Sequence, residues 1–295
     1  MPSAFARIAV PVDGSPASRR GLEIAITLAR DGGALSLAGV VDTANLLLPQ
    51  AEGALNDPGM AIEAAEADMR ATVHGALVRV REGGVPGEGF VIYGERVDAF
   101  AAFAHEQHAE AIVIGTNGRT GIARAVLGSM TEGLLLTAAM PVIAVHADDA
   151  VRDGPVLVAF DGSAPARAAF EVALRVALAR GRQLVLAHIL TKRESRDEAE
   201  RALAAAAAPA RAAGVSVEVI VGDGDPAAAL IAAADGRACS SIVTGTRALP
   251  SLERFVLGSV ATALVEHAHV PVLIARASSA PVGQSRRSAV TYAKV

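Results

Sequence analysis

A glycine-rich stretch that follows an apolar run could hold an anion. The run Ala111–Ile114 leads into Gly115-Thr116-Asn117-Gly118, and nine residues later comes Gly128-Ser129. Glycines let backbone N–H groups approach an anion closely. A helix that begins near Ser129 adds unpaired N–H groups and the positive end of its dipole. The pattern predicts a phosphate site. It is not a Walker A loop, because no lysine follows the glycine, and its spacing is not that of G-x-G-x-x-G.

An aspartate follows the first apolar run of the chain. Ile8–Val12 leads into Asp13-Gly14-Ser15. A carboxylate at this place could accept hydrogen bonds from a hydroxyl or amino group of a ligand. The alternative is a local role, because Asp is common in turns and at the N-cap of a helix, and a helix is expected from Pro16 onward.

Both features occur twice, which indicates a tandem duplication. Ala9–Ser15 is matched by Leu157–Ser163 at an offset of 148 residues. Three later matches, which begin at Ile112, Val126 and Pro141, all recur at an offset of 130. The second copy is therefore shorter by about 18 residues, the difference between the two offsets, and the region without a counterpart is Thr43–Met60.

The elements that must position these residues alternate between strand and helix. In copy one, strands are expected at Ile8–Val12, Leu35–Val41, Gly89–Tyr93, Ala111–Ile114 and Val142–Val145, and helices at Pro16–Arg30, Glu63–Glu82, Val97–His108 and Met130–Thr137. Short β-branched runs between amphipathic helices predict an α/β fold with parallel strands and helices on both faces of the sheet. We expect domains at residues 1–148 and 153–276 and a flexible C-terminal tail at 277–295, where the periodicity is lost.

Composition narrows the classes of function. The 27 Lys and Arg against 31 Asp and Glu give a net charge of -4, and aromatic residues make up 3% of the chain. Nucleic-acid binding is therefore not expected. No apolar run reaches the roughly 18 to 20 residues that a membrane span requires. With a single cysteine, Cys239, and no apolar leader at the start, the cytoplasm is the expected location.

The spacing Gly-x2-Gly-x9-Gly-Ser after the fourth strand resembles the ATP-binding signature of the universal stress protein family. Val12-Asp13-Gly14-Ser15 and the closing Pro141–Val145 run fit that family as well. The resemblance covers about residues 4–147 and 153–276. It implies a five-stranded parallel, Rossmann-like sheet in each copy, with adenine near the ends of the first two strands and phosphates in the glycine loop.

The resemblance also implies a set of binding residues in copy one. Asp13 would meet the ribose or the adenine edge, and backbone N–H groups at the start of the fourth helix would bind phosphate. The full set is Pro11, Val12, Asp13, Val40, Gly115, Gly118, Arg119, Gly128, Ser129, Met130 and Thr131. ATP is the expected ligand, with ADP and a cyclic nucleotide as alternatives. Any Mg²⁺ would be held mainly by phosphates and water, since no carboxylate cage is evident.

Copy two departs from the signature at one position. The matching residues are Asp161, Ile189, Gly245, Gly258, Ser259 and Val260, but the second glycine is replaced by Ala248. If that position needs a positive φ or close approach to phosphate, the methyl group costs on the order of 1 kcal/mol or more. We expect an intact site in copy one and a degraded one in copy two. In copy one, Arg96 replaces the proline found at Pro226, with little effect expected.

These residues predict a binding protein more than an enzyme. We expect a nucleotide-dependent stress-response regulator, and the alternatives are a weak ATPase and a structural dimerisation module without ligand. No general base or lysine clamp for the γ-phosphate is evident. The pair His105 and His108 lacks the H-E-x-x-H spacing and a third ligand, so no metal site is expected.

Two further expectations concern the arrangement of the copies. The last strands, Val142–Val145 and Val272–Ile274, would be apolar sheet edges, so the copies should pack on each other as an internal pseudo-dimer. Association of two chains is left open. The Thr43–Met60 insertion leaves the second strand beside the expected adenine position, and it is either a lid or a mobile insertion.

Overall fold

The computed structural model describes residues 3–43, 58–117, 127–191, 194–248, 255–276 and 291–295. Copy one contains β1 (Arg7–Pro11), α1 (Pro16–Ala29), β2 (Ala34–Val41), α3 (Pro58–Glu82), β3 (Gly87–Tyr93), α4 (Arg96–Glu106), β4 (Ala111–Gly115), α5 (Ser129–Thr137) and β5 (Val142–Val145). Copy two contains β6 (Val156–Ala159), α6 (Ala164–Arg180), β7 (Leu184–Ile189), α7 (Arg196–Ala212), β8 (Val217–Gly222), α8 (Pro226–Gly236), β9 (Ser241–Ala248), β10 (Phe255–Val256), α9 (Ser259–His267) and β11 (Val272–Arg276). Strand β12 (Tyr292–Lys294) closes the chain.

Each copy forms a parallel sheet of five strands. The order is β3-β2-β1-β4-β5 in copy one and β8-β7-β6-β9-β11 in copy two. The predicted α/β class is therefore confirmed. In both copies the order reverses between the first and fourth strands, which is the switch point where open α/β sheets bind ligands.

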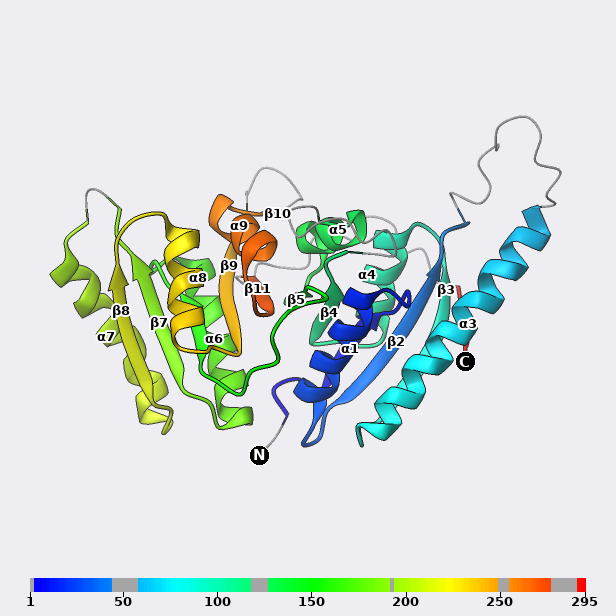
Figure 1. The fold of residues 1–295 in the computed structure, drawn as a ribbon, viewed down its shortest axis with the longest axis horizontal. Helices are drawn as coiled ribbons and strands as arrows, with labels where there is room; N and C mark the ends of the chain where they lie inside the picture. Colours follow the sequence, from blue (N-terminus) through cyan, green and yellow to red (C-terminus); the bar gives the residue numbers. More distant parts are fainter. Residues whose placement is uncertain (1–2, 44–57, 118–126, 192–193, 249–254, 277–290) are drawn as a thin grey trace.

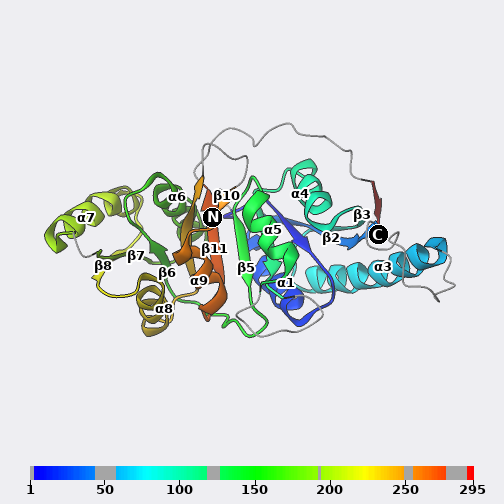
Figure 2. The same ribbon diagram turned by 90° about the horizontal axis from the view of Figure 1, so that it is seen from above.

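Helices cover both faces of the sheet (Figure 2). Helices α1, α3, α6 and α7 bury their apolar residues in one core, and α4, α5, α8 and α9 in the other. Because both faces are covered, the strands are apolar throughout: Ala111, Ile112, Val113 and Ile114 of β4 are all buried. Each of the two cores contains residues of both copies.

The two sheets join at their last strands. Strand β5 pairs antiparallel with β11, with Ala144 opposite Val272 and Val142 opposite Ile274. The strands of both copies therefore form one continuous sheet, as Figure 1 shows. Neither of these apolar strands is an exposed edge.

The end of the chain differs from the expected flexible tail. Strand β12 pairs antiparallel with β3, with Tyr292 opposite Ile92 and Lys294 opposite Phe90. The sequence missed it because three residues without a long apolar pattern give no strand signal of their own. The strand exists because β3 offers it an edge. Most of the Thr43–Met60 insertion lies outside the described residues, and helix α3 begins at Pro58, earlier than the expected Glu63.

Candidate functional site

A tight turn ends the first strand of each copy. In copy two, Gly162 has φ +76, a left-handed conformation that favours glycine, and the backbone N–H of Ser163 donates to Asp161 Oδ1 at 2.9 Å. Ser163 in turn caps α6, because its side chain accepts from the N–H of Ala166. The turn fixes the Asp161 carboxylate at the carboxyl end of β6.

Copy one repeats this turn. Gly14 has φ +77, and the N–H of Ser15 donates to Asp13 Oδ1 at 2.9 Å. Ser15 is the N-cap of α1 and accepts from the N–H of Ser18. One carboxylate oxygen of Asp13 thus has the local turn role that was the alternative to ligand binding, although the N-cap itself is Ser15.

The first glycine of the signature has a packing role in both copies. A Cβ on Gly245 would collide with the carbonyl group of Pro165, and a Cβ on Gly115 would collide with the backbone of Ala17. Any larger residue would push the fourth strand away from the start of the helix beside it. These glycines therefore hold the strand ends and helix starts together, a function that the spacing alone did not reveal.

The last glycine of the signature precedes an uncapped helix. Gly258 is the N-cap of α9 with φ -67 and ψ 155, and it provides no side-chain cap. The first N–H groups of α9, from Ser259 onward, lie before the first i→i−4 bond, which Thr262 N–H makes to Gly258 O. A Cβ on Gly258 would meet nothing within 4 Å. This helix start is open to an anion.

Copy one has the same arrangement at α5. Gly128 is the N-cap with φ -67 and ψ 146 and no side-chain cap, and its own N–H donates to Thr116 O at 2.8 Å. Ser129 is exposed at the helix start, and Thr131 is buried, with its hydroxyl donating to Gly115 O at 3.0 Å. Thr131 therefore ties the helix to the strand end through its side chain.

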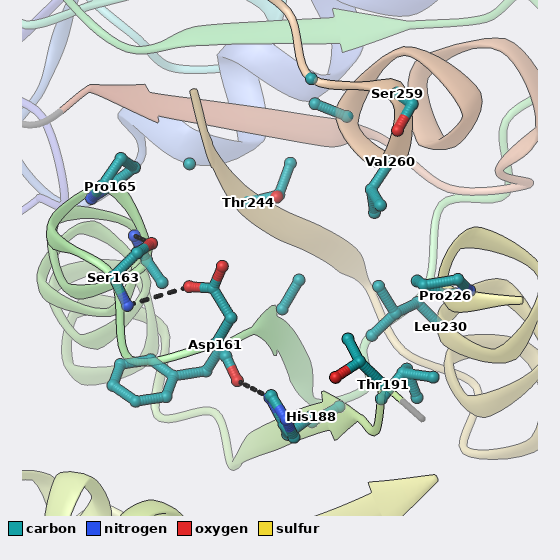
Figure 3. Close-up of a pocket in the computed structure, with 18 of the residues that line it drawn as sticks. Asp161, Ser163, Pro165, His188, Thr191, Pro226, Leu230, Thr244, Ser259 and Val260 are labelled. Atoms are coloured by element: carbon teal, nitrogen blue, oxygen red, sulfur yellow. Dashed lines mark hydrogen bonds between the residues drawn. The ribbon is translucent and has the colours of Figure 1, made fainter. Parts of the chain in front are cut away.

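These elements of copy two surround a cavity of about 450 Å³ at the carboxyl ends of β6, β7 and β9 (Figure 3). The carboxylate of Asp161 lies on one side and the start of α9 on the other. Apolar side chains from β7, α8 and α9 form part of the wall, and His188, Thr191 and Glu194 add polar groups beside them. The cavity is lined by Ala159, Phe160, Asp161, Ser163, Pro165, Ala166, Ala187, His188, Ile189, Thr191, Glu194, Pro226, Leu230, Thr244, Gly245, Gly258, Ser259, Val260 and Ala261.

The cavity contains all six residues predicted for copy two, namely Asp161, Ile189, Gly245, Gly258, Ser259 and Val260. Ala248, which we expected to degrade the site, is the last residue of β9 and is paired with Phe255. Strand backbone is extended, a conformation that alanine adopts without strain. A positive φ is therefore not required there, and that physical reason for a degraded site does not hold.

The residues predicted for copy one lie in several places. The structure places Asp13 and Gly115 at adjacent strand ends, with Gly128, Ser129 and Thr131 at the start of α5. Val40 and Met130 are partly buried against the core under α4 and α5. Pro11 and Val12 are buried, and Val12 packs in the opposite core, under α1 and α3. Gly118 and Arg119 lie outside the described residues.

The wall at the end of the second strand differs between the copies. Thr191 and Pro226 line the cavity of copy two. At the equivalent positions copy one has Asp42 and Arg96, and Arg96 Nε lies 3.0 Å from Asp42 Oδ2. The Asp42 side chain is 10% exposed. An ion pair therefore links β2 to the start of α4 where copy two has uncharged residues, so the substitution of Arg96 for proline is not structurally silent.

A histidine that the sequence reading missed ties two walls of the copy-two cavity together. His188 Nδ1 donates to Phe160 O at 2.9 Å, and its Nε2 lies 3.2 Å from Glu194 Oε2. Glu194 also accepts from the N–H of Thr191 at 2.7 Å, and this bond, together with His188, holds the pKa of Glu194 below its usual value. In copy one the corresponding residue is Gly39, where a side chain would collide with Met69.

Buried polar contacts also link the two copies. His146 Nε2 donates to the carbonyl oxygen of Val265 in α9 at 2.6 Å, and Nδ1 lies 2.8 Å from Thr116 Oγ1. Arg276, at the equivalent position of copy two, donates to the carbonyl oxygens of Leu134 and Leu135 in α5. Burial lowers the pKa of Arg276 to about 10. Each copy therefore holds the helix that starts at the other copy's glycine loop.

Two further searches cover the described part of the chain. None of its helices is long and apolar enough to cross a membrane. Within the same residues, no cluster of three or more His, Cys, Asp or Glu side chains is placed to hold a metal ion.

Comparison with known proteins assigns the family. The model of the universal stress protein family matches residues 4–146 and 154–276. The chain therefore belongs to the universal stress protein family. Universal stress protein Rv2005c of Mycobacterium tuberculosis is 33% identical over 187 residues, which cover 58% of this chain and 63% of that protein. The matched region thus spans less than two thirds of that relative.

One solved structure agrees with the fold over most of the chain. In a universal stress protein of Archaeoglobus fulgidus, the superposed region covers 94% of this chain and 100% of that protein's chain, with 21% identity and a TM-score of 0.75. For a universal stress protein solved in complex with cAMP, the superposed region covers 44% of this chain and 100% of that protein's chain, with 27% identity and a TM-score of 0.36.

Proposed function

We propose that the chain binds an adenine nucleotide, ATP in the first place, and that binding rather than turnover is its function. The observation that carries this proposal is the copy-two cavity, where a carboxylate, an apolar wall and an uncapped helix start face one space of about 450 Å³. That volume is within the usual range for small-molecule sites.

Each part of the cavity suits one part of a nucleotide. The N–H groups at the start of α9, beside the open space at Gly258, would bind phosphate. The Asp161 carboxylate would accept from a ribose hydroxyl. Ile189 and Leu230 would contact the base. Mg²⁺ would be bound by phosphate and water.

We propose the same ligand for copy one, on the matching geometry of Asp13 and the start of α5. The ion pair of Asp42 and Arg96 stands beside the copy-one site and has no charged counterpart at Thr191 and Pro226 of copy two. The sequence favours copy one and the described cavity favours copy two.

We further propose that the chain acts as an internal pseudo-dimer and regulates a partner by its nucleotide occupancy. The antiparallel pairing of β5 with β11 supports the first part. The reciprocal contacts of His146 and Arg276 support it as well, because each reaches the other copy. A catalytic role has less support, since Glu194 and His188 in the cavity wall are engaged with each other.

Two measurements test the proposal. Native mass spectrometry of the freshly purified chain should find an adenine nucleotide, at up to two per chain, and calorimetry of the emptied protein should show ATP binding without rapid release of phosphate. A chain that binds none of ATP, ADP and cAMP would rule out the proposal. Phosphate release at enzymatic rates would favour the ATPase alternative.

A further inference from the structure

The C-terminal strand occupies one outer edge of the continuous sheet. Three backbone pairs join β12 to β3, and Val295 N–H donates to Gly89 O at 2.9 Å. Tyr93 N–H donates to Thr291 O at 3.2 Å. These bonds are those of strand addition, in which an extended peptide lengthens a sheet and its alternate side chains decide specificity.

Side chains on one face of β12 fit an aromatic recess. The ring of Tyr292 packs edge-on against Phe90 and Phe103, with centroids 5.5 and 6.3 Å apart. Phe103 is fully buried and Phe90 is 5% exposed, whereas Tyr292 is 43% exposed. The recess is thus part of the core of copy one, and Tyr292 covers its open side.

The residues after Tyr292 also make contacts that depend on their charge and shape. Lys294 Nζ lies 2.5 Å from Glu88 Oε1, on the same face as Tyr292. Val295 packs on the opposite face, against the core under α3. The β3 edge therefore fits an aromatic residue, a basic residue two positions later and an aliphatic residue directly after that.

The equivalent edge in copy two, β8, is closed to such a peptide. Arg196 and Arg211 of α7 donate to the carbonyl oxygens of Val221 and Val217, which point away from β7. Glu218, the counterpart of Glu88, is bound by Arg237 at 2.7 Å. Charged side chains at a sheet edge are a common protection against strand addition.

The aromatic recess is also missing from copy two. Phe103 is replaced by Ala233 in α8, and Phe90 by Ile220 in β8. Since the two copies share their fold, the fit at β3 is a property of its own residues and not of the architecture.

We propose that the β3 edge is a docking site for an extended segment of a partner protein with the pattern aromatic-x-basic-aliphatic, and that the chain's own C-terminus is its tethered competitor. The proposal goes beyond nucleotide binding, because the edge lies outside the cavity. Residues 277–290 connect the strand to β11. Six strand spacings of about 4.8 Å separate β11 from β12, roughly 29 Å, within the roughly 50 Å reach of that connection.

A tethered strand competes at high effective concentration, so a free peptide gains access only when the strand is released. The test uses the full chain with Tyr292→Gly and Lys294→Gly to release the strand. The probe is a fluorescent synthetic peptide of the last eight residues, Ser-Ala-Val-Thr-Tyr-Ala-Lys-Val. Fluorescence anisotropy should show saturable binding, at least about ten-fold tighter to the released variant than to the wild type.

Charge reversal gives a matched control. Adding Glu88→Lys to the released variant should weaken peptide binding at least about ten-fold, and a peptide with glutamate in place of its lysine should restore it. Glu218→Lys, at the equivalent place on β8, should leave peptide binding unchanged. Thermal melting of each variant confirms that it is folded.

Three results would overturn the proposal. They are equal peptide affinity for the wild type and the released variant, no binding to either, and binding that Glu88→Lys leaves unchanged. Concentration-dependent dimers of the wild type that disappear in the released variant would assign the edge to a second copy of the chain instead of a partner protein.

Discussion

The two copies share one fold but treat the carboxyl end of the second strand differently. Copy two lines its cavity with Thr191 and Pro226, whereas copy one bridges the same place with Asp42 and Arg96. The glycine signature predicted the better site in copy one, because copy two has Ala248 in place of the second glycine. A loop signature therefore describes only one wall of a site, and residues elsewhere in the chain decide whether another wall is charged.

The largest expected effect comes from closing the anion site. Gly258→Val places a side chain where a Cβ meets no atom, in extended backbone that valine favours, so the fold should be preserved. It would occupy the space in front of the α9 N–H groups. We expect nucleotide affinity at copy two to fall about 100-fold, which corresponds to about 2.7 kcal/mol.

Gly128→Val is the matched variant for copy one. Calorimetric stoichiometry should decrease by one site in each single variant and by two in the double variant. Unchanged stoichiometry in Gly258→Val would show that the described cavity does not bind the nucleotide.

The packing role of the first glycine predicts a loss of stability. Gly245→Ala should reduce the free energy of unfolding by about 1 to 3 kcal/mol, because its Cβ meets the carbonyl group of Pro165 and the backbone must move. Gly115→Ala should do the same through Ala17. Urea denaturation measures both effects, and a loss of nucleotide binding at wild-type stability would contradict the packing role.

Exchanging the wall residues tests the comparison directly. Thr191→Asp with Pro226→Arg introduces the copy-one pair into copy two, and we expect about ten-fold weaker binding there, since two charged side chains would replace the uncharged Thr191 and Pro226 in the cavity wall. The reverse exchange, Asp42→Thr with Arg96→Pro, should strengthen copy one. Each exchange is measured by titration with ATP in a chain whose other site is closed by Gly128→Val or Gly258→Val. Unchanged ATP affinity in both exchanges would show that the ion pair does not affect binding.

A smaller effect is expected from Ala248→Gly. Ala248 is in a strand, so relief of backbone strain contributes nothing, and only the space taken by the methyl group remains. We expect copy-two binding to tighten by about five-fold, or about 1 kcal/mol, the low end of what the sequence suggested. A gain near 100-fold would show that the glycine is needed for a backbone conformation that binding induces.

The smallest effect concerns pH at the C-terminal strand. The hydrogen bond and charge of Lys294 hold the pKa of Glu88 below its usual value. The contribution of Glu88 to the pairing of β12 with β3 is therefore present above the pKa that Glu88 has in the unfolded chain. It is lost as the pH falls through the lowered pKa of Glu88 in the folded chain. The protection of Val295 N–H against hydrogen exchange, measured relative to the intrinsic exchange rate at the same pH, should decrease in acid, and the decrease should be absent in Glu88→Gln.

Much of the fold could be predicted from the chain alone. The repeat offsets located the duplication, and the apolar runs located the five strands of copy one because a sheet covered on both faces needs strands that are apolar throughout. The turn that the sequence offered at Asp13 as the alternative to ligand binding is present, because Gly14 has a positive φ and Ser15 N–H donates to the Asp13 carboxylate. Helix ends differed by a few residues, as at α3, because capping is a weak local signal.

The sequence by itself thus determined the fold class, the duplication and the glycine frame, since these depend on periodicity and spacing along the chain. Only the tertiary structure decided which side chains meet: the pairing of His188 with Glu194, the ion pair of Asp42 with Arg96, and β12 on the edge of β3. The last two of these contacts join separate elements, and β12 in particular depends on an edge that residues some 200 positions away provide. No local pattern encodes such a meeting, because its energy arises only after the chain has folded.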